Sequence, residues 1–382
     1  SSLCFINEKF SIGVLSSYIN SRNDIAWGDY YFLNHVAPSD FNHKLHKKEL
    51  SKFWESKGFK CSMMFDDFYS QFTGVHSERY ISMDIYYFYI LPCLNRFDFR
   101  LAYTDKNMYR TIFPDLNQPE TIVKCMNGCY YIGDTQYSSF QTVIDTLLSV
   151  KHDCIIKPTV DSCNGVGIAK LKFSDVEGLK DILASYGKNF IVQKKVKQHI
   201  EMARLNTSSL NTLRVFTYRT LDGVIHYMEG KTFGRFGGTD SVMDNGSAGG
   251  GLIKVDDDGT VDDKIVFFNR MVHGSLEKDK GIQNFVIPRF ADIKKLVVKQ
   301  HEHLPHFDFI GWDISIEENG NPIFIEFNIE PSVEGPQMIS GPFFGNYFDD
   351  MLERLIGAKK VKSNCYRNVF KNGFEYQQIV NK

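Results

Sequence analysis

Two apolar runs decide the fold of this chain: Ile310-Gly311-Trp312-Asp313-Ile314-Ser315-Ile316 and Pro322-Ile323-Phe324-Ile325-Glu326-Phe327-Asn328. The short polar segment between them contains the step Asn319-Gly320, and an Asn-Gly step between alternating apolar runs is a strong signal for a hairpin. We therefore expect the two runs to pair as antiparallel strands.

Three oxygen-bearing side chains lie on these strands: Asp313, Glu326 and Asn328. Residues two apart in a strand share a face, so Glu326 and Asn328 can reach one site while their neighbours face the core. Carboxylate and amide oxygens suit a small hard cation that keeps water and phosphate oxygens in its other positions. A solvated hairpin face is the alternative, and it would explain Asp313 alone. The three together predict a magnesium site that carries nucleotide phosphates.

Length and charge restrict the class of protein. With 382 residues and 44.0 kDa, the chain can form two or three domains or lobes around a real core. Its 44 Lys and Arg residues against 46 Asp and Glu residues give a formal net charge of -2, so bulk charge indicates no nucleic-acid partner. The most apolar run, at 85–94, contains Pro92 and is shorter than the ~20 residues of a membrane helix, so we expect no membrane span.

The cysteines indicate a reducing compartment. The eight of them are scattered along the chain. Cys125 and Cys129, which lie closest together, lack the second pair and the histidines of a zinc module. We therefore expect reduced thiols in a cytoplasmic protein.

The order of strand and helix patterns predicts an α+β or mixed α/β chain. Residues 1–100 carry short helical signals, such as the amphipathic stretch 46–56, and indicate a mainly helical N-terminal region. Mixed patterns then suggest one lobe at 101–193 and a second at 194–382. The other predicted strands are 154–157, 167–173, 189–193, 212–219, 223–234 and 251–255, and the predicted helices are 134–150, 290–303 and 348–357.

A loop of small residues follows the buried strand Ile155-Ile156-Lys157-Pro158. We name residues 161–167 the flap, and it contains Ser162, Gly165 and Gly167. Glycines let the backbone approach a phosphate closely, and Lys157 adds a cation where the strand ends. A plain hairpin turn is the alternative. We predict that Lys157 and the flap bind phosphate.

A second junction, which we name the hinge, is Gln193-Lys194-Lys195-Val196 at the end of an apolar strand. Such a junction can offer backbone groups to an adenine edge between apolar walls. An ordinary strand end is the alternative.

The order of these parts resembles the ATP-grasp superfamily. The shared parts are a lysine in Thr104-Asp105-Lys106, the Ile-Lys-Pro strand with its flap, the Val-Gln hinge, and Asp, Glu and Asn on the closing strands. The chain resembles the sugar-transfer-associated branch in particular, through Gln198-His199 before Leu210-Asn211-Thr212-Leu213-Arg214-Val215, Met243-Asp244-Asn245 with 249–251, and Gly311-Trp312-Asp313. Members of that branch are linked with bacterial surface-polysaccharide assembly. The resemblance covers roughly residues 91–356.

This resemblance implies an ATP-grasp fold, in which two α+β lobes clamp ATP and Mg²⁺. Lys106 and Lys157 would contact phosphates, the flap would close over them, and the hinge would hold adenine. The chain departs from many members by having Lys194-Lys195 where those members carry an acidic residue. Ribose contact would then fall to Gln198 or His199, and a surface loop histidine is the alternative for His199.

The resemblance also implies chemistry in which a carboxylate attacks the γ-phosphate and an amine then attacks the acyl phosphate. Arg214 lies between apolar neighbours, where a charge is costly unless it is paired or used, and its planar fork suits a carboxylate or acyl phosphate. A salt bridge to a neighbouring carboxylate is the alternative. Arg235 ranks second, and Asn211 and Asn245 could orient substrate, although ordinary turn roles explain Asp244-Asn245 nearly as well.

The sequence therefore predicts an ATP-dependent, ADP-forming ligase that acts on a small carboxylate and an amine or sugar acceptor. Its substrate would be a sugar or polysaccharide precursor, and other polysaccharide-assembly enzymes could be partners, as the resemblance implies. A sugar or polyol kinase is one alternative, because the same array of cations serves any in-line attack on a γ-phosphate. A non-catalytic ATP-binding scaffold is the other.

Overall fold

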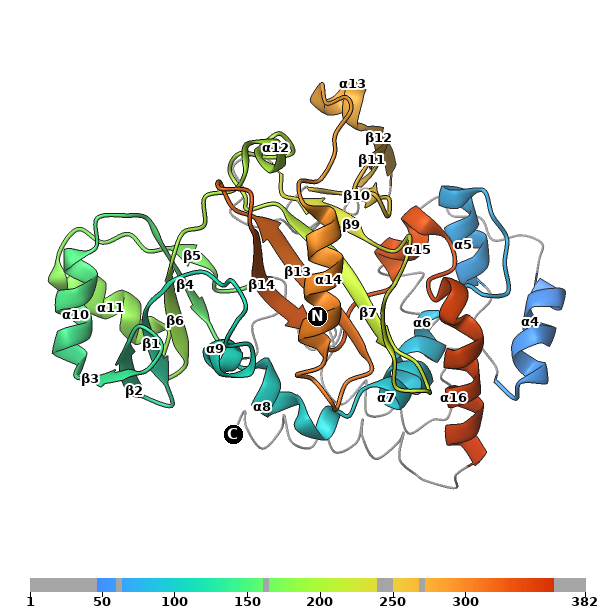
Figure 1. The fold of residues 1–382 in the computed structure, drawn as a ribbon, viewed down its shortest axis with the longest axis horizontal. Helices are drawn as coiled ribbons and strands as arrows, with labels where there is room; N and C mark the ends of the chain where they lie inside the picture. Colours follow the sequence, from blue (N-terminus) through green and yellow to red (C-terminus); the bar gives the residue numbers. More distant parts are fainter. Residues whose placement is uncertain (1–46, 60–63, 161–164, 239–249, 268–271, 361–382) are drawn as a thin grey trace.

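The computed structural model describes residues 47–59, 64–160, 165–238, 250–267 and 272–360, and it contains two sheets that lie side by side with helices around them (Figure 1). Every strand pair within these ranges is antiparallel. The predicted α+β architecture of two lobes is confirmed. Two predicted site residues, Ser162 and Asn245, fall outside the described ranges.

The first sheet, which we name the small lobe, has the strand order β3-β2-β1-β6-β4-β5. Its strands are β1 (Thr121–Met126), β2 (Cys129–Ile132), β3 (Gln136–Ser138), β4 (Cys154–Pro158), β5 (Ala169–Lys170) and β6 (Phe190–Lys194). Helices α10 (Phe140–Ser149) and α11 (Val176–Ser185) cover one face (Figure 1). There Val123, Ile156 and Val192 share a buried core with Ile144 and Leu179.

Strand alternation gives the small-lobe sheet a second, charged face. Lys124 of β1 and Lys157 of β4 both lie opposite Ile191 of β6 in the ladder. Directly paired residues point to the same side of a sheet, so both lysines stand on the face turned away from α10 and α11.

The second sheet, which we name the large lobe, has the order β12-β11-β10-β9-β7-β13-β14, with β8 also paired to β7. Its strands are β7 (Thr212–Arg219), β8 (Ile225–Tyr227), β9 (Phe233–Phe236), β10 (Gly251–Val255), β11 (Val261–Phe267), β12 (Val272–Ser275), β13 (Phe309–Ile316) and β14 (Pro322–Asn328). Helix α14 (Phe290–His301) covers one face, where Ile293 and Val297 share a core with Leu213, Val215 and Trp312.

The N-terminal helices cover the other face of the large-lobe sheet, together with the C-terminal helices. Phe216 and Phe309, which point to this face, share one buried core with Trp54, Tyr69 and Tyr86. The predicted N-terminal region is mainly helical, but its described part shares a core with the large lobe and is not a separate unit. The helices concerned are α4 (Lys47–Ser56), α5 (Met64–Thr73), α6 (Met83–Ile85), η2 (Tyr86–Ile90), α7 (Leu91–Leu94), α15 (Glu334–Ser340) and α16 (Phe348–Lys360).

Short helices connect these parts. They are η3 (Phe97–Phe99), α8 (Arg100–Thr104), η4 (Lys106–Met108), α9 (Tyr109–Ile112), α12 (Ile200–Ala203), α13 (Leu276–Lys280) and η6 (Gly345–Tyr347). None of the helices that the structure describes is long and apolar enough to span a membrane.

Three predicted elements are wrong in their bounds. The strand predicted at 223–234 is two strands, β8 and β9, because the chain turns between them at Gly230, whose φ is +65°. The helix predicted from residue 134 begins at Phe140, since Ser139 caps it by accepting a hydrogen bond from Thr142 N, and β3 precedes it. The strand predicted at 167–173 shrinks to β5, because Gly167 has a φ of +76°, which a strand does not accommodate.

Candidate active site

Three neighbouring strands bring the predicted metal residues and an arginine to one face of the large-lobe sheet. β13 pairs with β14 so that Asp313 lies opposite Glu326 and Gly311 lies opposite Asn328. β13 also pairs with β7, where Arg214 lies opposite Asp313. The antiparallel hairpin predicted from the Asn-Gly step is therefore confirmed, and it places these side chains together.

Asp313 is buried between two arginines, and we name Arg214, Asp313 and Arg235 the arginine cluster. Arg214 donates from Nε to Oδ1 at 2.5 Å and from Nη2 to Oδ2 at 3.1 Å. Arg235, on β9, donates from Nη2 to Oδ2 at 2.8 Å. Burial is the largest influence on the pKa of Asp313 and opposes ionisation, but the guanidinium groups together outweigh it and hold that pKa below its ordinary value. The salt-bridge alternative for Arg214 is thus the arrangement that the structure shows.

Two lysines of the small lobe reach the same place from the opposite side, and we name Lys106 and Lys157 the lysine pair. The Lys106 ammonium lies 3.3 Å from Glu326 Oε2. Lys157 is buried, and burial, followed by the positive charge of Lys106, lowers its pKa to about 8 against the opposing effect of Glu326. The lysine pair and Glu326 therefore connect the two lobes at the hairpin.

Asn107 fixes the turn that carries Lys106. Its Nδ2 donates to Cys125 O and to Thr159 Oγ1, at 3.0 Å each. The Lys124 ammonium, whose pKa is lowered chiefly by burial, donates to Asn107 O at 3.4 Å. Sequence reasoning missed Lys124, although a charge within the apolar run of β1 is a usable signal. This residue links the charged face of the small lobe to the Lys106 turn.

The oxygen donors of the hairpin fit Mg²⁺. Asn328 has a buried amide nitrogen without a hydrogen-bond partner among the described residues, and the oxygen and nitrogen of such an amide can be exchanged in assignment. The Glu326 side chain is 30% exposed, so a ligand can reach it. A carboxylate has about four lone-pair positions, and Asp313 is 1% exposed and accepts three hydrogen bonds from the arginines, so at most about one position is left for a cation.

Three residues predicted to contact substrate or ribose make hydrogen bonds within the loop between the lobes. Asn211 is fully buried, and its Nδ2 donates to two backbone carbonyls at 2.7 Å each. Gln198 Oε1 accepts a hydrogen bond from Asn211 N at 3.0 Å. His199 Nδ1 accepts from Glu201 N and so caps α12. These contacts give Asn211 and His199 structural roles in the loop, and their predicted roles toward substrate and ribose stay predictions.

The hinge is bound to its neighbours through part of its backbone. Lys194 N donates to Glu120 O at 2.9 Å, and Lys195 N donates to Asp153 O at 2.8 Å. These two N–H groups are therefore directed at protein atoms, and an adenine edge would have to use Gln193 or other hinge groups. The adenine role of the hinge, Val196 included, stays a prediction.

Two flap glycines lie within the described residues. Gly165 and Gly167 have φ values of +74° and +76°, a region that favours glycine. A Cβ added at Gly167 would lie 2.7 Å from Pro158 Cγ, so Gly167 packs closely on the end of the strand that carries Lys157. The phosphate-binding role of the flap stays a prediction.

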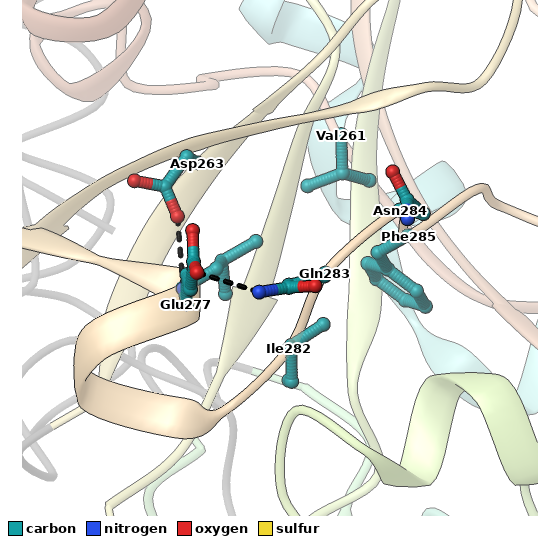
Figure 2. Close-up of a pocket in the computed structure, with 8 residues that line it drawn as sticks. Val261, Asp263, Glu277, Ile282, Gln283, Asn284 and Phe285 are labelled. Carbon is teal, nitrogen blue, oxygen red and sulfur yellow. Dashed lines mark hydrogen bonds between the residues drawn. The ribbon is translucent and has the colours of Figure 1, made fainter.

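A cavity of about 340 Å³ lies elsewhere in the large lobe, between β11, α13 and the segment 282–285 (Figure 2). It is lined by Val261, Asp263, Leu276, Glu277, Ile282, Gln283, Asn284 and Phe285. The lining contains two carboxylates and no Lys or Arg, so it would repel phosphate. The chemistry of the lysine pair and the arginine cluster therefore identifies the candidate active site better than this cavity does.

Residues 92–346 match the family described as sugar-transfer associated ATP-grasp. The chain belongs to this family. The matched residues include the lysine pair, the arginine cluster and the hairpin donors. The candidate active site therefore lies within the part of the chain that matches the sugar-transfer associated ATP-grasp family. No curated protein matches the chain.

Several solved structures are similar to this family member at low identity. The ATP-grasp ligase PsnB with its minimal precursor has 14% identity and a TM-score of 0.40 over 66% of this chain. A biotin carboxylase from Campylobacter jejuni has 10% identity and a TM-score of 0.43 over 69% of this chain. The D-alanine-D-alanine ligase from Coxiella burnetii has 7% identity and a TM-score of 0.39 over 68%. The chain spans 61%, 48% and 59% of those chains, respectively.

Proposed function

We propose that this member of the sugar-transfer associated ATP-grasp family is an ATP-dependent, ADP-forming ligase that joins a carboxylate to an amine or a related acceptor. The observation that carries the proposal is the meeting of the lysine pair with Glu326 beside the arginine cluster. Cations and oxygen donors gathered in this way can align and neutralise a γ-phosphate in transfer. Such chemistry needs no covalent protein nucleophile.

ATP and Mg²⁺ are the proposed cofactors. Glu326, Asn328 and Asp313 would hold the metal, which would neutralise and orient the phosphate oxygens when bound. The lysine pair would bind phosphate oxygens from the small-lobe side. An anion beside Lys157 favours its charged form, so nucleotide binding should raise the pKa of this lysine from about 8.

The arginine cluster supplies charge for the second substrate. Two guanidinium groups face one carboxylate, so the cluster keeps a net positive charge next to the hairpin. We propose that it orients a substrate carboxylate, whose oxygen attacks the γ-phosphorus as the bond to ADP breaks. An amine then attacks the acyl carbon, the amide forms, and inorganic phosphate and a proton leave.

The substrate class rests on the family description. We propose a carboxylate or an acceptor that belongs to a sugar or polysaccharide precursor, in cytoplasmic assembly of a cell-surface polysaccharide. Other enzymes of that assembly would be the partners. The sugar transfer named in the family description supports this choice.

A hydroxylamine-trapping assay tests the reaction type. The protein is incubated with Mg-ATP, hydroxylamine and pools of amino acids, uronic acids and nucleotide sugars, and hydroxamate and ADP are measured by mass spectrometry. A ligase should give a hydroxamate that depends on one carboxylate, together with ADP. A phosphorylated sugar without hydroxamate would establish the kinase instead, and no turnover in any pool would leave the binding scaffold.

Two variants of the hairpin provide the control. Glu326→Gln should lower hydroxamate formation by at least about 10²-fold, because it removes a charge from the phosphate-binding array. Glu318→Gln changes an exposed carboxylate at the turn of the same hairpin and should leave the rate unchanged. Equal rates in the two variants would contradict the assignment of Glu326.

A further inference from the structure

The N-terminal helices and the segment that leaves β14 hold each other by hydrogen bonds. Asn95 Nδ2 donates to Phe309 O at 2.7 Å and to Ile329 O at 2.6 Å. Gln337 accepts from Ile81 N at 2.7 Å and donates to Ile81 O at 3.0 Å. The segment 329–337, which directly follows the hairpin donors, is therefore fixed at both ends by residues from before position 96.

Tyr86 makes the central contact of this kind. Its hydroxyl donates to Pro331 O at 2.5 Å, and its side chain is fully buried. Burial raises the pKa of Tyr86 well above its ordinary value, and the carboxylates of Glu334 and Glu330 raise it further, while Arg214 opposes them. Tyr86 therefore stays a protonated donor, and it lies within electrostatic range of Arg214.

Pro331 in turn covers the strand beside Asp313. A Cβ added at Gly311 would lie 2.7 Å from Pro331 Cβ and 3.2 Å from Arg214 Cδ. Pro331 and the Arg214 side chain thus pack over the same point of β13, two residues before Asp313. A shift of Pro331 would open space into which the Arg214 side chain could move.

We propose that Tyr86 is a positioning residue for the arginine cluster: by holding Pro331 over Gly311, it confines Arg214 against Asp313. The role of Arg214 in binding the substrate carboxylate rests on the proposed function. Tyr86 lies before residue 92, where the family match begins, so this contact adds a residue from the N-terminal helices to the site. The N-terminal helices would then help to set the geometry for the carboxylate, and not only the stability of the sheet.

Tyr86→Phe tests the proposal, since it removes one hydroxyl and keeps the ring. Hydrogen exchange of the amides at 329–334 should become faster in this variant, because Pro331 loses its anchor. The KM for the carboxylate should rise roughly 3- to 10-fold, which corresponds to the net worth of one hydrogen bond, while the KM for ATP stays unchanged.

Tyr218→Phe is the matched control. Tyr218 is also fully buried, and its hydroxyl donates to Asp350 Oδ2 at 2.6 Å, away from Pro331. This variant should lose stability without a change in exchange at 329–334 or in the KM for the carboxylate. Equal effects of the two variants on the KM for the carboxylate would show that Tyr86 acts only through stability, and this would overturn the proposal.

The outcomes separate this proposal from the proposed function. If the parent protein forms no hydroxamate, the ligase fails, but exchange at 329–334 still decides whether Tyr86 holds the segment. If Tyr86→Phe does not fold, Gly311→Ala displaces Pro331 from the other side and should produce the same rise in exchange and in the KM for the carboxylate. Unchanged exchange in the variant that folds overturns the positioning role.

Discussion

Lys157 is buried, and burial disfavours the charged form of its side chain. The side chain is 8% exposed, and its pKa is lowered from 10.5 to about 8. The unfolded chain therefore binds more protons than the folded protein between pH 8 and 10.5, and stability due to this group rises with pH across that window. The penalty is fully present below about pH 8. A position that costs stability in the absence of ligand is typical of a functional site.

Replacement of this lysine should separate stability from binding. Lys157→Met should raise the free energy of unfolding at pH 7 by roughly 1–3 kcal/mol, because the buried charge is gone, and the gain should shrink at pH 10. The same variant should lose the thermal shift caused by Mg-ATP. Urea unfolding and thermal denaturation measure the two effects. Lys172→Met, at an exposed position, is the control, and its free energy of unfolding should stay within about 0.5 kcal/mol of the parent. A Lys157→Met variant that is less stable than the parent would contradict the explanation by a buried charge.

At the scale of single residues, the sequence predicted which side chains gather but not which partners they have. Lys106, Lys157 and Glu326 meet as the resemblance implies, because their positions follow from local motifs. Asn211 and His199 have polar side chains at similar junctions, yet both make hydrogen bonds within the loop 198–211: Asn211 Nδ2 donates to Met202 O, and His199 Nδ1 accepts from Glu201 N. Such contacts depend on how the loop closes, and periodicity does not report loop closure.

Among the elements, α14 is joined to the centre of the large-lobe sheet by a buried histidine. His301 Nδ1 lies 2.7 Å from Thr217 Oγ1, and its Nε2 lies 2.7 Å from Phe307 O. Trp312 Nε1 donates to the same Thr217 hydroxyl at 2.8 Å. The Thr217 hydroxyl therefore donates to Nδ1, and Nε2 carries the proton that Phe307 O accepts. One neutral imidazole thus links α14 to β7 and to the segment that precedes β13.

This histidine should make the fold sensitive to acid. Burial is the main cause that lowers the pKa of His301 from 6.5 to about 3, so the unfolded chain binds the extra proton between these values. Stability due to His301 is present above pH 6.5 and is lost as the pH falls toward 3. Between pH 6.5 and 5 the loss should be roughly 2 kcal/mol.

His301→Asn provides the comparison, because it cannot take up a proton. Urea unfolding of the parent and the variant at pH 7 and pH 5 should show a smaller loss in the variant, by roughly 2 kcal/mol. Exposed His152→Asn should behave like the parent. An equal loss in parent and His301→Asn would show that His301 is already protonated in the folded state.

The hairpin and the 223–234 segment show what element prediction can achieve from sequence. The β13–β14 hairpin was predicted correctly because its register is fixed by a local turn at Asn319-Gly320. The segment 223–234 forms two strands, β8 and β9, which pair with β7 at different places on either side of the turn at Gly230. A local turn such as Asn319-Gly320 can be recognised in the sequence, whereas the place at which two strands pair with one partner strand cannot.

At the scale of the molecule, the N-terminal helices and the large lobe form one core. Trp54 of α4 is 2% exposed and packs edge-on against Phe348 of α16, with ring centroids 6.0 Å apart. The same core continues through Tyr86 to Phe216 and Phe309 of the sheet. Sequence alone could not show that the large-lobe sheet supplies the other half of this core.

A shared core predicts shared unfolding. Trp54→Ala should lower the free energy of unfolding by roughly 3–5 kcal/mol, because it leaves a large cavity in that core. Trp312 lies in β13 on the opposite face of the sheet, and it is the single tryptophan when Trp27→Phe and Trp54→Phe form the reference background, so its fluorescence there reports the large lobe. Its denaturation midpoint should fall in Trp54→Ala and stay unchanged in Phe173→Ala, which alters a partly exposed side chain of the small lobe. If the N-terminal helices instead unfold on their own, the Trp312 midpoint will not respond to Trp54→Ala, and their influence on the arginine cluster through Tyr86 would lose its structural basis.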